Sequence, residues 1–75
     1  MNVRLRTMAE NQDSVFGAND AARVGVGPDE LLNLTRRGQL VRVRRGAYVL
    51  AERYAAAEPS GQYLLRAEAV LRTRG

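Results

Sequence analysis

The chain has 75 residues, a formal net charge of +4 at pH 7, and neither cysteine nor histidine. This length fits one small domain, and the missing residue types exclude a disulfide framework, a thiolate metal site and proton transfer by imidazole. We therefore predict that the protein is not an enzyme and has no catalytic residue, metal site, cofactor or small-molecule substrate. No apolar run approaches the roughly 20 residues that span a bilayer, so we expect a cytoplasmic protein without a membrane partner.

The positive charge is concentrated in one short segment. Residues 1–35 sum to −2 (three arginines, five acids), residues 36–50 to +5 (five arginines, no acid) and residues 51–75 to +1 (four arginines, three acids). A field of one sign on a short folded element favours a polyanionic partner, and nucleic acid is the usual one.

Helical spacing and turn residues predict two helices before residue 25. The first extends over residues 3–11 and ends in a polar turn at residues 11–14, after which the chain enters the core. The second extends over residues 18–24, with Asp20 in its first turn, where the helix dipole favours an anion, and Gly25 after its end. The expected inward side chains are Leu5, Met8, Ala9, Gln12, Val15, Phe16, Ala21, Ala22 and Val24.

A third helix is predicted to begin at Pro28 and to end at Arg37. Proline is pre-organised for the first helical position, and Gly38 suits the left-handed conformation that follows many helices. Leu31 and Leu34 are three residues apart and are expected to face the core. Two short helices joined by so few residues are typical of a helix-turn-helix, whose second helix is presented to the DNA major groove.

A basic hairpin follows the third helix. Residues 40–44 alternate as a half-buried strand would, with Val41 and Val43 on one face and Arg42 and Arg44 on the other. A turn at residues 45–46 then leads to a second strand over residues 47–50. This order predicts an α+β, mostly α, winged helix-turn-helix with three helices, a two-stranded wing and a carboxy-terminal helix.

The tail is predicted to be a linker followed by a closing helix. Residues 51–54 form a connection or a short helical turn, and Ser60 can cap a fourth helix that runs to about Thr73. We expect this helix to close the core against the first helix, so that residues 1–75 form one domain, with residues 51–75 completing residues 1–50. Alternatively it begins a further domain or forms a dimer seam, with Arg72 and Arg74 near the join. Its predicted apolar stripe is Leu64, Ala67, Val70 and Leu71, with Arg66 and Glu68 outside.

Two segments of the chain resemble the amino-terminal winged-helix domain of the AbiEi family of antitoxins. They are Gly25-Val26-Gly27-Pro28 and Gly38-Gln39-Leu40-Val41-Arg42-Val43-Arg44-Arg45-Gly46-Ala47-Tyr48, together with Leu31 and Leu34. The resemblance covers residues 3–50 and is most specific in the Arg-Gly-x-Tyr element at residues 45–48. It implies a member of a type IV toxin–antitoxin system that represses its own operon. Gly17 and Gly27 stand at helix starts where that family often has Ser or Thr, so backbone N–H groups would have to meet a phosphate there.

In that family a larger carboxy-terminal domain carries the antitoxin activity. The resemblance therefore implies that the chain is either a fragment of a longer protein or a stand-alone regulator.

Six residues are candidates for DNA contact. Arg42, Arg44 and Arg45 are placed for phosphates or for insertion into a minor groove, because guanidinium groups enter minor grooves readily. Asn33 and Arg36 share the exposed face of the third helix and suit adenine and guanine edges, respectively. Arg37 is expected to contact phosphate or to cap helix carbonyls.

Several of these residues also have structural explanations. A row of arginines on an exposed strand can serve to keep a sheet edge soluble, and polar residues on an exposed helix face are ordinary. Tyr48 is expected to pack its ring beneath the wing. Leu32 lies off the core face, where it could contact a thymine methyl group, the tail or a dimer partner.

Three functions fit the sequence. The first is a DNA-binding transcriptional regulator, with double-stranded DNA as its partner and with a homodimer or a further carboxy-terminal domain completing it. The second is a winged-helix module that binds a protein. The third is a DNA-targeting module of a larger DNA-modifying enzyme.

Overall fold

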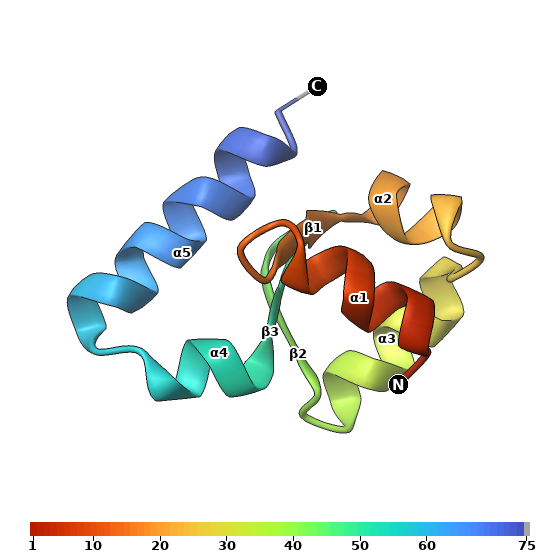
Figure 1. Cartoon of the computed structure of the whole chain (residues 1–75), viewed down its shortest axis with the longest axis horizontal. Coiled ribbons are helices and arrows are strands. Elements are labelled where there is room, and N and C mark those ends of the chain that lie inside the picture. Colours follow the sequence, from red (N-terminus) through yellow and green to blue (C-terminus); the bar gives the residue numbers. More distant parts are fainter. Residues whose placement is uncertain (75) are drawn as a thin grey trace.

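The computed structural model describes residues 1–74, in which helices flank a small antiparallel sheet (Figure 1). The elements in chain order are α1 (Val3–Glu10), β1 (Val15–Gly17), α2 (Ala18–Arg23), α3 (Pro28–Arg36), β2 (Leu40–Arg44), β3 (Ala47–Leu50), α4 (Ala51–Ala56) and α5 (Pro59–Arg72). The α+β fold with a helix-turn-helix, a wing and a carboxy-terminal helix is as predicted.

The local signals in residues 1–40 place the helices within a residue or two of their predicted bounds. Asn2 caps α1 through its side-chain oxygen, which accepts from the backbone N–H of Arg4 at 2.8 Å. Pro28 occupies the first turn of α3. Gly25 and Gly38 follow α2 and α3 with φ of 82° and 78°, a conformation that glycine adopts without steric cost.

The sheet has a third strand that the sequence did not predict. Its order is β1-β3-β2, and β1 pairs with β3 through Val15 with Val49, Phe16 with Tyr48 and Gly17 with Ala47. Residues 47–50 are therefore a central strand and not the outer half of a two-stranded wing. A strand of three residues is too short to show an alternating pattern, which is why its pairing could not be read locally.

One face of the sheet covers the helix-turn-helix core. The ring of Phe16 is fully buried there and stacks on Tyr48, with ring centroids 5.7 Å apart, as predicted for the Tyr48 ring. This first cluster contains Leu5, Ala9, Phe16, Ala21, Val26, Leu31, Leu34, Leu40 and Leu50. Ala22 was expected to point inward but is exposed, whereas Val26 in the turn is buried.

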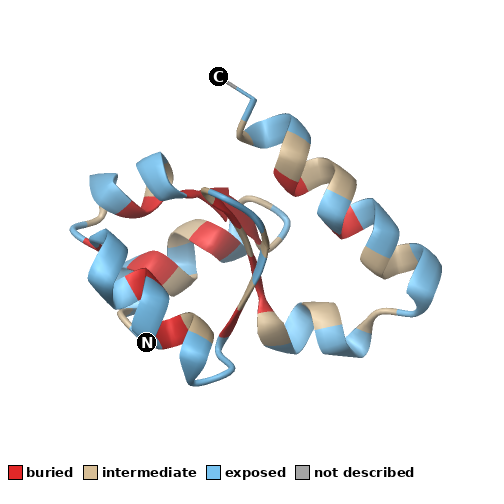
Figure 2. Cartoon of the chain, turned by 180° about the vertical axis from the view of Figure 1, so that it is seen from behind, coloured by how far each residue is buried: buried red, intermediate tan, exposed pale blue. Residues whose placement is uncertain are grey.

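The other face of the sheet is covered by α5, which corrects two predictions. The helix packs on the strands and not on α1, and its inward residues are Leu65 and Ala69, which meet Val15, Ala47 and Val49. Of the predicted stripe, Leu64 and Leu71 are 66% and 64% exposed. Figure 2 shows exposed residues along the outer side of this helix. Leu64 and Leu65 are adjacent, so α5 carries leucines on two different faces. Only the face that contains Leu65 packs against the sheet.

The connection after β3 is the short helix α4, which was one of the two alternatives predicted for this segment. The start of the last helix differs from expectation: α5 begins at Pro59 with Glu58 as the preceding cap residue, so Ser60 is not the cap. No helix in residues 1–74 is long and apolar enough to cross a membrane.

The packing of α5 predicts different effects for two neighbouring leucines. Leu65→Ala should lower the free energy of unfolding by about 2 to 3 kcal/mol, because it removes a buried side chain from the hydrophobic cluster between α5 and the sheet. Leu64→Ala, the matched control, should change it by no more than about 0.5 kcal/mol. Urea unfolding followed by circular dichroism measures both, and equal effects would contradict the orientation of α5.

Candidate nucleic-acid interface

The wing is short, and its turn is attached to the helix-turn-helix. Arg45 and Gly46 close the hairpin between β2 and β3, and Gly46 has a φ of 79°, which favours glycine. The backbone N–H of Ala18, the first residue of α2, donates to the carbonyl oxygen of Gly46 at 3.0 Å. The position of the wing tip is therefore fixed relative to α2.

A β-bulge in β2 places arginines on both sides of the wing. Arg42 is opposite Tyr48, whereas Arg44 is opposite Ala47, so the register shifts by one residue between them. Paired residues share a face, and a bulge breaks strict alternation. Arg42 therefore lies on the α3 side of the sheet with Tyr48, while Arg44 lies on the α5 side with Ala47. The prediction that both arginines share one face is wrong because of this bulge.

A groove of about 380 Å³ lies between α3 and the wing. Leu32 and Thr35 line it from α3, and Arg42 and Arg45 line it from the wing. The hydroxyl of Thr35 donates to the carbonyl of Leu31 at 2.8 Å, so it is bonded within its own helix. We call this feature the α3–wing groove; it has a largely apolar lining and guanidinium groups along one side.

The remaining candidates lie around the outward face of α3. Asn33 and Arg36 are both exposed, and neither lines the α3–wing groove. Arg37 is the C-cap residue of α3 and is also exposed. At the other end of the helix, Asp29 and Glu30 occupy the first turn, where they oppose close approach of phosphates.

The arginines of residues 36–50 are not neutralised by carboxylates in the described chain. Within residues 1–74, ion pairs form between Arg6 and Glu10 (3.4 Å), Arg6 and Glu52, and Arg23 and Asp20 (3.6 Å). None of them uses Arg36, Arg37, Arg42, Arg44 or Arg45. Their positive field is therefore available to an external anion.

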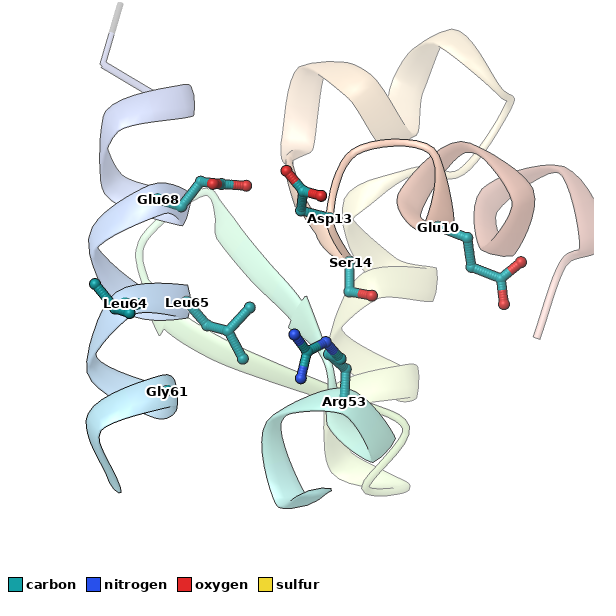
Figure 3. A pocket seen from close by; sticks show the side chains of 8 residues that line it. All are labelled: Glu10, Asp13, Ser14, Arg53, Gly61, Leu64, Leu65 and Glu68. Atoms are coloured by element: carbon teal, nitrogen blue, oxygen red, sulfur yellow. The ribbon is translucent and has the colours of Figure 1, made fainter. Parts of the chain in front are cut away.

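A cleft of about 440 Å³ between α5 and the α1–β1 turn has the opposite character. Figure 3 shows the carboxylates of Glu68 and Asp13 pointing toward one another, with Arg53 below them reaching toward Leu65. Oxygen Oε2 of Glu68 is buried and has no hydrogen-bond partner in residues 1–74. The carboxylates of this cleft would repel a phosphate, so the cleft does not extend the candidate interface.

Within the described chain, no three His, Cys, Asp or Glu residues lie together in a way that could hold a metal ion.

Sequence reasoning missed the groove residue Thr35, and it left the role of Leu32 open between a thymine methyl group, the tail and a dimer partner. The available signal was the exposed position of Leu32 beside the helix face that carries Asn33 and Arg36. The sequence could not place Leu32 in a groove, because the other wall of that groove is the wing, which lies beside Leu32 only in the folded chain.

Comparison with known proteins agrees with this geometry. Residues 3–51 match the family described as "Transcriptional regulator, AbiEi antitoxin". This range covers α1 to β3 and reaches the first residue of α4. No curated protein and no solved structure matches the chain. Because the match spans well over half of the sequence, the chain belongs to the family of AbiEi antitoxin transcriptional regulators.

Proposed function

We propose that the chain is the DNA-binding domain of an antitoxin-type autorepressor, which binds duplex DNA at the promoter of its own operon. The observation that carries this proposal is the set of five arginines of residues 36–50, which lie at the end of α3 and on the wing that follows it and form no ion pair within residues 1–74. Catalysis has no part in it, and the ligand is the duplex itself.

The wing supplies affinity in this proposal. Arg42 and Arg44 extend from opposite faces of the hairpin, and Arg45 occupies its tip. A ribbon with guanidinium groups on both faces suits the minor groove, which has a phosphate backbone on each side. Such contacts are insensitive to base sequence and position the protein on the duplex.

The third helix supplies specificity. Asn33 and Arg36 project from the outward face of α3, where amide and guanidinium groups can read adenine and guanine edges in the major groove. Leu32 is 45% exposed and lines the α3–wing groove, so of its possible roles we propose contact with a thymine methyl group. Asp29 and Glu30 keep the first turn of α3 away from phosphates, and they could accept a hydrogen bond from cytosine N4 or serve only the helix dipole.

A second candidate function is a winged-helix module with a protein partner or a second copy of itself. The outward side of α5 favours it, because Tyr63, Leu64 and Leu71 are all at least 64% exposed there. Salt dependence separates the two functions. If four or five arginines neutralise phosphates, the slope of log K against log salt is about −3.6 to −4.5, at about 0.9 per contact. A protein partner is expected to give a shallower slope.

Removing the wing arginines should weaken binding to every duplex equally. The Arg42→Ala/Arg44→Ala variant should lose about 60-fold in affinity at 0.1 M salt and about 1.8 in salt slope, from two lost phosphate contacts. Fluorescence anisotropy with the DNA upstream of the gene and with an unrelated duplex measures both effects. Arg53→Ala/Arg66→Ala is the control, since it makes the same charge change at exposed positions outside the interface. If both variants behave alike, the wing is not the binding element.

Replacing the amide on α3 should change preference more than affinity. Asn33→Ala is expected to cost about 1 to 3 kcal/mol on the preferred sequence, while binding to unrelated duplexes is unchanged. Competition among duplexes that differ by single base pairs tests this. A variant that ranks those duplexes as the parent does would remove Asn33 from the specificity contacts.

A further inference from the structure

A second basic groove lies on the other side of the wing tip. It has a volume of about 560 Å³ and is formed by the start of α2, the wing turn and the end of α5. Four arginines line it: Arg23 from α2, Arg45 from the turn, and Arg72 and Arg74 from the end of α5. We call it the α5–wing groove.

Among the described residues that line this groove, only Asp20 carries a carboxylate, and that carboxylate is already engaged. Asp20 accepts a hydrogen bond from the backbone N–H of Gly17 at 2.9 Å and lies 3.6 Å from a guanidinium nitrogen of Arg23. Arg45, Arg72 and Arg74 form no ion pair with any described residue. Three guanidinium groups from two distant segments therefore line one groove without a carboxylate partner among residues 1–74.

The end of α5 is held in this place by close packing. A Cβ atom added to Gly17 would lie only 2.8 Å from Cγ2 of Thr73, so the end of α5 packs closely against the start of α2 at this glycine, and a side chain here would force Thr73 to shift. The hydroxyl of Thr73 donates to the carbonyl of Ala69 at 2.8 Å, which fixes its methyl group toward the sheet. Figure 1 shows the last turn of α5 directed toward the side of the sheet where α2 begins. Arg72 and Arg74, on either side of Thr73, are positioned by the same contact.

Arg45 lines both grooves, so the wing turn is the ridge between them. A ribbon inserted in a minor groove has one phosphate backbone on each side. With one backbone on the α3 side, near Arg42, the other passes over the α5 side, where Arg44, Arg72 and Arg74 lie.

We propose that the α5–wing groove binds the phosphate backbone of the same duplex, with Arg72 and Arg74 as phosphate-contacting residues. The proposal rests on the proposed function, because it takes the wing as the element that enters the DNA. It extends the binding surface beyond residues 3–51, which carry the family resemblance, to the carboxy-terminal helix. These contacts add affinity and no base preference, since phosphates carry no sequence information.

The test is an Arg72→Ala/Arg74→Ala variant of the whole chain, titrated with the same two duplexes over a range of salt. We expect an affinity loss of about 60-fold at 0.1 M salt, equal on both duplexes, and a salt slope smaller by about 1.8. Arg72→Lys/Arg74→Lys should keep the parent slope, because lysine also neutralises phosphate. Arg53→Ala/Arg66→Ala is the control for charge alone.

The outcomes distinguish this proposal from the one on which it rests. The parent could bind DNA with a steep salt slope while the Arg72→Ala/Arg74→Ala variant matches the control. The groove then binds no phosphate, and an acidic protein surface becomes its expected partner. That result overturns this proposal only. A slope that lysine does not restore also overturns it, because the loss would then come from altered packing. A parent that binds neither duplex overturns both proposals.

Discussion

The pairing of β3 on both of its edges is the constraint on which the rest of the structure depends. Its hydrogen bonds to β1 join the wing to the start of the helix-turn-helix, and its two faces separate the two hydrophobic clusters. Tyr48 and Val49, adjacent in the chain, face different cores. A domain of this size buries only about 60% of its unfolded surface, so covering both faces of one central strand is an effective use of few apolar residues.

The charge distribution follows from this arrangement. Because β3 begins beside α2, the turn before it brings Arg45 close to both α3 and the end of α5. The acids of the tail lie elsewhere, with Glu52 paired to Arg6 and Glu68 facing the acidic cleft. Summed along the sequence, residues 51–75 carry only +1. Folding separates the arginines at the end of α5 from the acids of the tail. The end of α5 therefore lies beside the basic wing, and the rest of the tail does not.

Sequence reasoning succeeded where the signal is local and failed where two distant segments meet. Gly25, Pro28 and Gly38 mark the ends of α2 and α3 by their own backbone preferences, and the alternation after Leu40 indicates a strand. The bulge in β2 could not be read, because the alternating pattern continues through Arg44 while the register shifts. The α5–wing groove was equally inaccessible, since its arginines lie at positions 23, 45, 72 and 74 and only the approach of α5 to Gly17 unites them.

The attachment of the wing tip bears on how the domain would engage a duplex. A long, free ribbon would lose backbone entropy on entering a groove, whereas this hairpin closes in two residues and is already bonded to Ala18. The position of the wing tip relative to the helix-turn-helix would therefore be set before binding, and the ordering would fall mainly on exposed side chains. Gly17 contributes to the same result from the other side, because its lack of a side chain lets Thr73 pack against α2. A glycine at this helix start has no hydroxyl that could contact phosphate. Its lack of a side chain leaves room for the end of α5, which carries Arg72 and Arg74.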